Sequence, residues 1–504
     1  MNNLDRFLNR ITMYRLTLYV LIGQLLAGFI LALFHRLPFS GMDLAIEVVI
    51  LLVVCWVANW VFAKTFKTVA NVESVYITAL ILALIITPNL ERPGLFLLGW
   101  AGVWAIASKF MFTQRGKHIF NPAAIGVVIT ALFIHQAASW WVGNAVMLPS
   151  VLIGGALIVR KIRRFDLVAA GIGAGLVTIM VLGLLNHGSF SDLLQKALIT
   201  SPLVFFATVM LTEPRTSPAF HKQQVVYGLL AGVLFAPQLH LGKLYATPEL
   251  ALVIANVYAF AVSPKLKLTL TLKQKIQLAP DIFDFIFTSP RPLGFTPGQY
   301  LEWTLAVPKG DRRGNRRYFT IASSPTEHDI RMGVRFYPKP SRFKQQLVNL
   351  QPGQTIIASH LAGSFTLPKD PNQKLAFIAG GIGITPFRSM VKYLLDTNQK
   401  RDMVLLYSNK LMSDIVYVDV FREAQRVGLH TVYTLTDTAN VPPNWGGKVG
   451  PITPELIKQA IPDFYQRVFY LSGPQAMVTA FERELKTMGA PRANIKTDYF
   501  PGFA

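Results

Sequence analysis

Hydrophobic residues form long uninterrupted runs in the first half of the chain and short alternating stretches in the second half. Ten apolar runs of roughly membrane-spanning length lie within residues 1–264. They cover about residues 15–35, 42–63, 73–88, 94–113, 119–137, 146–160, 165–186, 194–212, 223–241 and 247–263. This pattern predicts a polytopic helical membrane domain, residues 1–264, with about ten spanning helices.

The second half has the pattern of a soluble module. Strands are predicted near residues 266–278, 281–289, 300–307, 317–323 and 331–337, separated by Gly and Pro turns. This region, 265–370, is expected to be an antiparallel β-barrel domain. From residue 375 onward, strands alternate with helices, which predicts a doubly wound α/β domain over 371–504 with nucleotide chemistry at the strand ends.

Charge follows the same division. Residues 1–264 contain 18 Lys and Arg and 9 Asp and Glu, whereas residues 265–504 contain 31 and 18. The net charge of +22 would suit nucleic acid, but no nucleic-acid motif accompanies it, and we expect no nucleic-acid partner. Cys55 is the only cysteine, which excludes an intrachain disulfide and an all-protein iron–sulfur cluster.

Basic residues mark one side of the membrane. They precede the first run and follow the second, fourth, sixth, eighth and tenth, whereas the opposite loops hold few. The positive-inside rule then predicts a multi-pass protein of the cell inner membrane, with the lipid bilayer as a partner and residues 265–504 in the cytoplasm.

Two segments of the membrane half carry motifs. Residues 120–126 read FNPAAIG, with Asn121 placed to cap a helix that begins at Pro122. Residues 207–218 read ATVMLTEPRTSP. Together they resemble the family of integral-membrane flavoproteins found in the Rnf complex and in the sodium-translocating NADH:quinone reductase. Glu213 stands where that family usually has Asp.

The resemblance implies a flavin, but one motif is missing. The family usually attaches FMN covalently to an (S/T)GA(T/S) motif, which does not occur in this sequence. The corresponding loop, residues 136–146, offers only Ser139 as a hydroxyl. We therefore expect no covalent FMN, and a non-covalent FMN or a quinone between helices stays open.

The sharpest motif of the soluble half is RYFTIASSP, residues 317–325. A flavin dinucleotide needs a cation for its pyrophosphate, an aromatic plane and a small hydroxyl near the reactive nitrogen. Alternation along a strand places Arg317 and Phe319 on one side and Tyr318 and Thr320 on the other.

Further candidate contacts follow along the chain. Ser341 is predicted to start a helix whose N-terminus can hold phosphate. Gly363 allows backbone to approach a ligand, and Phe365 is expected to be available for stacking. Arg335, in the strand near 331–337, is another expected cofactor contact.

A second motif, AGGIGITP at 379–386, follows a buried strand and opens a helix, as a phosphate-binding loop requires. Thr385 is expected to cap this helix, with Pro386 in its first turn. A third turn, YLSGPQAM, spans 470–477. The predicted nucleotide contacts are Gly380, Gly381, Gly383, Thr385, Pro386, Tyr407, Ser408, Gly473, Pro474 and Met477.

These three motifs, in this order, resemble the FAD-dependent ferredoxin-NADP reductase family. The resemblance implies that Arg317, Phe319 and Thr320 serve FAD, that Ser341 serves its phosphate, and that the glycine loop serves NAD(P)H. It also implies catalytic roles for Thr320, Ser472 and Phe500. Ser472 stands where the family has cysteine, and Pro338 where it has glycine. Lys410 is the one cation found where a 2′-phosphate would be bound, and no cluster of arginines accompanies it. This favours NADH over NADPH.

The two halves together predict a membrane-bound flavin oxidoreductase. Electrons would pass from NAD(P)H through FAD to a membrane cofactor, a quinone, a small redox acceptor or an electron-transfer protein, with partner subunits left open. One alternative is a haem-containing transmembrane reductase or oxidase, which needs paired mid-membrane histidines. Another is a non-catalytic scaffold that senses redox state.

Overall fold

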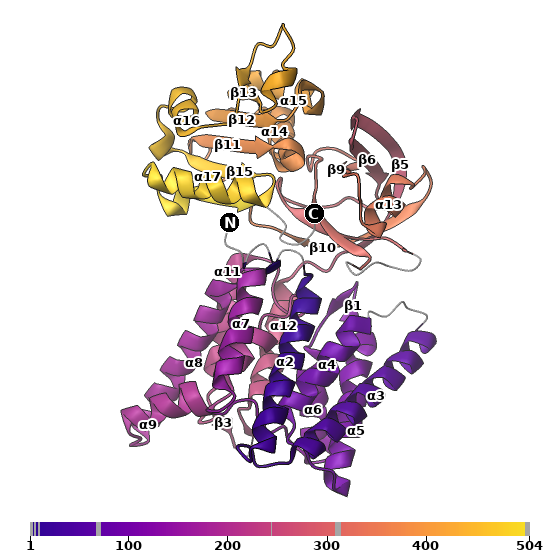
Figure 1. The fold of residues 1–504 in the computed structure, drawn as a ribbon, viewed down its shortest axis with the longest axis vertical. Helices are drawn as coiled ribbons and strands as arrows, with labels where there is room; N and C mark the ends of the chain where they lie inside the picture. The colour runs from indigo at the N-terminus through magenta and orange to yellow at the C-terminus, as the bar shows by residue number, and fades with distance from the viewer. Residues whose placement is uncertain are drawn as a thin grey trace. The chain divides into compact units, whose positions relative to one another are not determined.

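The structure is a computed structural model that describes residues 4, 7–8, 11–66, 72–242, 244–307 and 314–498. The chain divides into two compact units (Figure 1). One unit runs from Arg10 to Lys265, and the other consists mainly of the residues from Leu266 onward.

Helices make up almost all of the first unit. Polar side chains cap several of them, as Ser40 does for α3 by accepting a hydrogen bond from the Asp43 amide. The helices are α2 (Met13–Leu33), α3 (Gly41–Thr65), α4 (Val72–Ile85), α5 (Arg92–Met111), α6 (Pro122–Phe133), α7 (Leu148–Ile162), α8 (Phe165–Leu185), α11 (His221–Leu234) and α12 (Pro248–Val262). Two short hairpins, β1 (Thr113–Gln114) with β2 (Lys117–His118) and β3 (His240–Leu241) with β4 (Leu244–Tyr245), lie between helices.

Within the described residues, four helices are long and apolar enough to cross a membrane: α2, α3, α5 and α8. A fifth span is obtained if the bent segments Phe190–Thr200 and Leu203–Met210 count as one. Three shorter apolar helices accompany them. The ten predicted runs all contain helix, but ten spanning helices are not confirmed.

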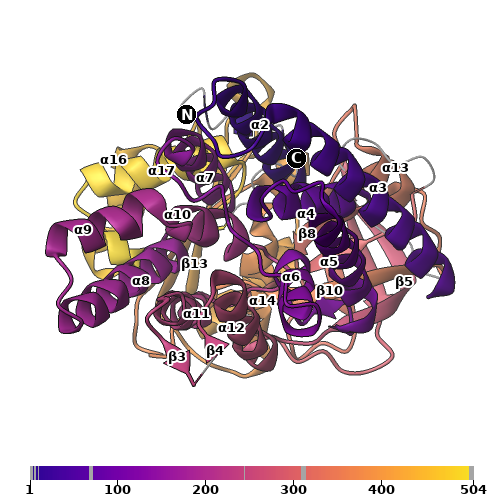
Figure 2. The same ribbon diagram turned by 90° about the horizontal axis from the view of Figure 1, so that it is seen from below.

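Small residues let two of these helices approach closely. A Cβ on Gly232 of α11 would lie 2.3 Å from the Gly171 carbonyl oxygen of α8, and one on Gly228 would lie 2.5 Å from that of Leu167. Helix α11 therefore packs against α8 through its glycines and against α12 on another side (Figure 2). Close backbone packing of this kind is typical of membrane helices.

The run predicted over 194–212 is broken. It contains α9 (Phe190–Gln195), a π-helical turn η1 (Lys196–Thr200), α10 (Leu203–Phe205) and a second π-helical turn η2 (Phe206–Met210). The two halves differ in direction by 52°. Pro202 lies at the break, and because proline lacks an amide hydrogen it cannot continue the helical bonding.

The second unit begins with a six-stranded antiparallel sheet. Its strands are β5 (Lys267–Ala279), β6 (Ile282–Thr288), β7 (Tyr300–Thr304), β8 (Arg316–Thr320), β9 (Ile330–Arg335) and β10 (Thr355–Ala362), in the order β8-β7-β10-β5-β6-β9. Helix α13 (Arg342–Val348) lies between β9 and β10 along the chain. Five strands match the prediction, β10 was not predicted, and closure of the sheet into a barrel stays a prediction.

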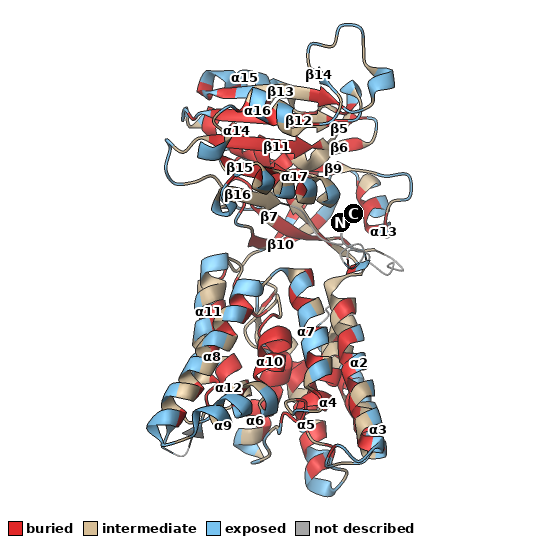
Figure 3. Cartoon of the chain, turned by 60° about the vertical axis from the view of Figure 1, so that its left-hand side comes forward, coloured by how far each residue is buried: buried red, intermediate tan, exposed pale blue. Residues whose placement is uncertain are grey.

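A six-stranded parallel sheet follows. It contains β11 (Leu375–Gly380), β12 (Met403–Asn409), β13 (Leu429–Leu435), β14 (Lys448–Val449), β15 (Val468–Ser472) and β16 (Ile495–Asp498). The connecting helices include α14 (Thr385–Asp396), α15 (Val418–Glu423), α16 (Pro454–Ala460) and α17 (Gln475–Thr487). Strand β11 is buried along its whole length (Figure 3).

The strand order predicts where a ligand would bind. It runs β14-β13-β12-β11-β15-β16, so the chain reverses direction of travel across the sheet between β11 and β15. In open α/β sheets, ligands bind at the carboxyl ends of the strands beside such a reversal. The predicted glycine turns follow β11 and β15.

Candidate nucleotide sites and membrane motif cluster

The two glycine turns are packed directly against each other. A Cβ on Gly383 would lie 2.5 Å from both the Gly473 Cα and the Ser472 carbonyl oxygen. A Cβ on Gly380 would lie 2.4 Å from the Met477 sulfur. A larger residue at Gly383 would have to move backbone, and this close approach explains why the turns need glycine.

The helix that follows the first turn starts as predicted, with one difference. Pro386 lies in the first turn of α14. Thr385 does not cap the helix, because its hydroxyl donates to the Ile382 carbonyl oxygen at 3.3 Å. The loop Gly381–Ile384 forms a 3-10 turn, which makes Thr385 itself helical.

Strand β8 presents the flavin motif on two faces. Arg317 and Phe319 both face Phe343 of α13, with the guanidinium 5.2 Å from that ring and the Phe319 ring centroid 6.2 Å from it. Tyr318 faces the other way, and its hydroxyl donates to Glu302 Oε2 at 2.8 Å. The predicted alternation is therefore confirmed.

Arg317 is a buried cation. It is only 2% exposed and donates to the carbonyl oxygens of Gly314 at 3.2 Å and Arg316 at 2.6 Å. Its guanidinium also lies against α13, the helix that Ser341 caps. A guanidinium beside a helix N-terminus is a donor set whose chemistry fits a phosphate group.

Three polar residues lie near one another where β8, β15 and β16 end. Ser472 lies in register with Asp498 on the neighbouring parallel strand, and the Thr320 side chain is close enough to the Asp498 carboxyl to influence its pKa. Burial raises the pKa of Asp498 to about 7, and the Thr320 side chain lowers it in part. Phe500 lies outside the described residues.

The side chains of Ser341 and Arg335 both form hydrogen bonds or ion pairs within the protein. Ser341 caps α13 as predicted, accepting from the Lys344 amide at 3.4 Å. Arg335 forms ion pairs with Asp281 at 2.7 Å and Asp414 at 3.0 Å. A Cβ on Gly381 would lie 3.3 Å from Arg335 Nη1, so this side chain reaches the first glycine turn.

Two aromatic expectations were wrong. Phe365 is 5% exposed and its ring lies 5.0 Å from that of Tyr470 and 5.8 Å from that of Phe387, so it belongs to the core and is not available for stacking. Tyr407 is fully buried, and its hydroxyl accepts from the Val416 amide at 3.5 Å. Tyr407 lies on β12, a strand inside the parallel sheet, and such a strand carries core residues even near its carboxyl end.

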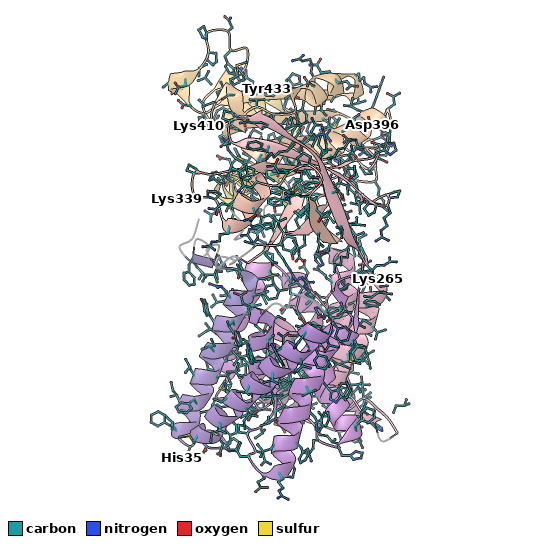
Figure 4. All side chains as sticks on the ribbon, turned by 90° about the vertical axis from the view of Figure 1, so that its right-hand side faces the viewer. His35, Lys265, Lys339, Asp396, Lys410 and Tyr433 are labelled. Carbon is teal, nitrogen blue, oxygen red and sulfur yellow. The ribbon has the colours of Figure 1, made fainter. Side chains whose placement is uncertain are left out.

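The backbone of Gly363 and the exposure of Ser408 agree with their predicted roles as ligand contacts. Gly363 has φ of +118°, which favours glycine. Ser408 lies half-buried near the end of β12, and Lys410 follows that strand on the surface (Figure 4). Pro474 immediately precedes α17.

The membrane unit brings its two motifs together. Asn121 caps α6 with its side-chain oxygen, while its Nδ2 donates to Glu213 Oε2 at 2.8 Å. The same carboxylate oxygen accepts from Thr216 Oγ1 at 3.0 Å. The Asn121 amide donates to Asn256 Oδ1 at 2.7 Å, which adds α12 to the cluster. Nothing in the sequence pattern had linked Asn256 to the two motifs.

A small cavity of about 60 Å³ adjoins this cluster. Its lining includes Tyr14, Thr17, Ser74, Thr78, Asn121 and Glu213. Lys109 Nζ donates to Ser74 Oγ at 3.1 Å and to the Ser74 carbonyl oxygen at 2.8 Å. The cavity thus combines apolar helix surfaces with a few fixed polar groups, as cofactor pockets do.

A second cavity, of about 330 Å³, lies beside the broken helix. Its lining includes Trp140, Lys196, Ser201 and Glu249, and Trp140 Nε1 donates to Glu249 Oε2 at 2.7 Å. Ser139, the one hydroxyl of the 136–146 loop, also lines it. The Ser139 hydroxyl is hydrogen-bonded to Thr87 Oγ1 at 2.5 Å and lies 3.3 Å from the Ile85 carbonyl oxygen.

Two family models match the chain. Residues 377–483 match the model described as "Oxidoreductase NAD-binding domain", and residues 141–264 match the model described as "NQR2, RnfD, RnfE family". The two matches fall in different structural units.

Curated relatives match slightly less than half of the chain. The glycine betaine monooxygenase reductase subunit of Chromohalobacter salexigens is 26% identical over 232 residues, 45% of this chain and 62% of that protein. Its Pseudomonas aeruginosa counterpart is 28% identical over 218 residues, 42% of this chain and 59% of that protein. NADH-cytochrome b5 reductase 1 of Emericella nidulans is 26% identical over 234 residues, 44% of this chain and 74% of that protein. The chain thus spans about three fifths of the length of the first two relatives.

Solved structures match a similar share of the chain. Amycolatopsis cytochrome P450 reductase GcoB matches with a TM-score of 0.42 and 24% identity, covering 47% of this chain and 70% of that one. The cytochrome b5 reductase domain of Ulva prolifera nitrate reductase matches with a TM-score of 0.41 and 22% identity, covering 47% and 98%.

Proposed function

We propose that this chain, which joins an NQR2/RnfD/RnfE-type membrane region to a ferredoxin-reductase-type module, is an NAD(P)H-dependent flavin oxidoreductase that delivers electrons to an acceptor in its membrane unit. The observation that carries the proposal is the position of Ser472 beside Asp498 and near Thr320, next to the paired glycine turns. The proposed domains are residues 1–264, 265–370 and 371–504.

FAD supplies the chemistry of accepting hydride and releasing single electrons. The first sheet would hold it. Arg317 binds the pyrophosphate through charge-assisted hydrogen bonds, Tyr318 presents its ring from the opposite face of β8, and the α13 N-terminus at Ser341 lies toward the phosphates. Phe500 is a further proposed contact of the ring system.

The parallel sheet would bind the nicotinamide dinucleotide. Gly380, Gly381 and Gly383 let backbone amides approach the phosphates, and Gly473 and Pro474 form the facing wall. Ser408 and Lys410 lie near the end of β12, where the ribose is read. Because Lys410 is a single cation and a 2′-phosphate usually needs several, we propose NADH as the preferred donor.

Thr320, Ser472 and Asp498 would control the reacting end. Small side chains at Thr320 and Ser472 leave room for two stacked rings. Burial raises the pKa of Asp498 to about 7, so its carboxyl carries a proton below about that pH. Hydride adds negative charge to the flavin, so a neutral carboxyl there favours transfer and an ionised one opposes it.

The membrane unit would hold the acceptor. The proposed site is the cavity beside Asn121 and Glu213, where the amide and the carboxylate would bind the polar edge of a planar ring. A non-covalent FMN or a quinone has this chemistry. The basic loops support an inner-membrane location with the reductase module in the cytoplasm.

Membranes containing the full chain provide the test. NADH consumption would be followed with a quinone, with ferricyanide and with no added acceptor, each with and without sodium. Quinone-dependent consumption supports the proposal. Consumption with ferricyanide alone would place the acceptor outside the membrane unit, and no consumption with any acceptor would refute the enzyme assignment.

A further inference from the structure

One buried ion pair joins the two cofactor motifs of the second unit. Arg388 is the fourth residue of α14, the helix that begins at the nicotinamide loop. Its Nη1 and Nη2 donate to Glu327 Oε2 and Oε1 at 2.6 and 2.9 Å. Such bidentate pairing fixes both distance and orientation.

The same arginine also holds the flavin strand. Arg388 Nη1 donates to the Ala322 carbonyl oxygen at 2.8 Å, two residues beyond Thr320. The next residue, Ser389, donates its hydroxyl to the Ser323 carbonyl oxygen at 2.6 Å. Glu327 completes the loop by accepting from the Ser324 amide at 2.7 Å.

Both ends of α14 are held in this way. At its carboxyl end, Asp396 accepts a hydrogen bond from Thr326 Oγ1 at 2.5 Å (Asp396 is labelled in Figure 4). Residues 322–327 therefore bond to the helix near its start and at its end. We name residues 322–327 with Arg388, Ser389 and Asp396 the motif latch.

The ion pair at the centre of the motif latch is largely buried. The side chains of Arg388 and Glu327 are 3% and 21% exposed. The facing groups are Asp284, paired with Arg331 at 3.5 Å, and Tyr417, whose ring lies 5.5 Å from the Arg388 guanidinium. Burial alone would raise the pKa of Glu327, but the Arg388 bonds and charge hold that pKa below its usual value. The pair is therefore ionised at neutral pH.

We propose that Arg388 is a positioning residue that sets the distance between the nicotinamide loop and the flavin strand. The inference rests on the proposed function for the identity of the two ligands. Thr320 precedes Ala322 by only two positions, and Gly383 precedes Arg388 by five. The bond between Arg388 and Ala322 therefore restricts the distance between the two predicted ligand sites. Hydride transfer needs the reacting atoms about 3–3.5 Å apart, and a misplacement of about 1 Å costs roughly 100-fold in rate.

The test compares Arg388→Lys with Arg426→Lys in the full chain with FAD bound. Lysine keeps the charge but cannot pair with a carboxylate bidentately. Arg426 is the control, because its pair with Glu423 is exposed on both sides and its hydrogen bond to the Leu395 carbonyl oxygen of α14, at 3.2 Å, is one that a lysine ammonium can also donate. Anaerobic mixing with increasing NADH gives the limiting rate of flavin reduction and the NADH dissociation constant, and long-wavelength absorbance reports stacking of the two rings.

For Arg388→Lys we expect a limiting rate about 10- to 100-fold lower, weaker stacking absorbance, and FAD content and NADH affinity close to those of wild type. Arg426→Lys should match wild type. In the purified full chain, hydrogen exchange of residues 320–328 should become faster in Arg388→Lys and stay at the wild-type rate in Arg426→Lys. Ser389→Ala, which adds no charge or bulk, should show the same pattern more weakly and serves if the lysine variant does not fold.

Unchanged limiting rate and exchange in Arg388→Lys would overturn the proposal, as would a rate loss that only follows lost FAD. If NADH does not reduce the flavin of the wild-type chain, the proposed function fails, and the exchange measurement still decides whether Arg388 holds the flavin strand.

Discussion

A methyl group at Gly383 tests how closely the two glycine turns must approach. The added Cβ would lie 2.5 Å from the Gly473 Cα and the Ser472 carbonyl oxygen, whereas ordinary contacts begin near 3.4 Å. The obstacles are backbone atoms and cannot rotate away. One turn must therefore retreat by about 1 Å, which predicts a loss of roughly 100-fold in the rate of flavin reduction, or about 2.7 kcal/mol of barrier.

Stopped-flow reduction of the bound FAD by NADH measures this loss in Gly383→Ala. The NADH dissociation constant should also rise, because the loop amides move from the phosphates, while FAD content stays at the wild-type level. Gly446→Ala is the matched control, since a Cβ added there would meet no atom within 4 Å. Wild-type kinetics in Gly383→Ala, or loss of FAD with unchanged nicotinamide kinetics, would refute the reasoning.

Three further outcomes are expected. Arg317→Ala should weaken FAD binding about 10- to 100-fold, the worth of a charged hydrogen bond, measured by flavin retained after desalting; full retention would contradict the role of Arg317. Denatured protein should show no flavin fluorescence at the position of the 56.0 kDa chain, and a fluorescent band would mean covalent FMN despite the missing motif. The rate of flavin reduction should fall as pH rises through about 7, where Asp498 ionises; Asp498→Asn should remove this dependence, and an unchanged profile would exclude Asp498 as its source.

Local pattern was sufficient for most elements. The apolar runs located the helices because every backbone group in a membrane must be satisfied within its own helix. In the second unit, five strands of the first sheet lie where alternation predicts them. Strand β10 was missed because its residues, TIIASHLA, pair with β5 and β7 over long sequence separations and show only weak alternation.

Contacts between distant residues could not be predicted in the same way. Asn121 and Glu213 are separated by 92 positions, and Arg388 and Glu327 by 61. The sequence motifs contain Asn121 and Glu213 but do not show that the two side chains touch. No local sequence pattern indicates the Arg388–Glu327 pair. The sequence predicts one continuous helix over 194–212 and misses the break at Pro202. The residues on both sides of Pro202 are equally apolar, and composition carries no information about the direction of a helix.

The central claim is that electrons from NADH reach an acceptor bound in the membrane unit. The most direct measurement compares quinone reduction with ferricyanide reduction by the full chain in lipid nanodiscs, using Asn121→Ala and the exposed control Asn186→Ala. Asn121→Ala removes a hydrogen bond to the Glu213 carboxylate, so we predict that it lowers NADH-dependent quinone reduction about tenfold or more. Ferricyanide, which takes electrons from the flavin, should be reduced at the wild-type rate in both variants. Equal quinone reduction by wild type and Asn121→Ala would contradict the account.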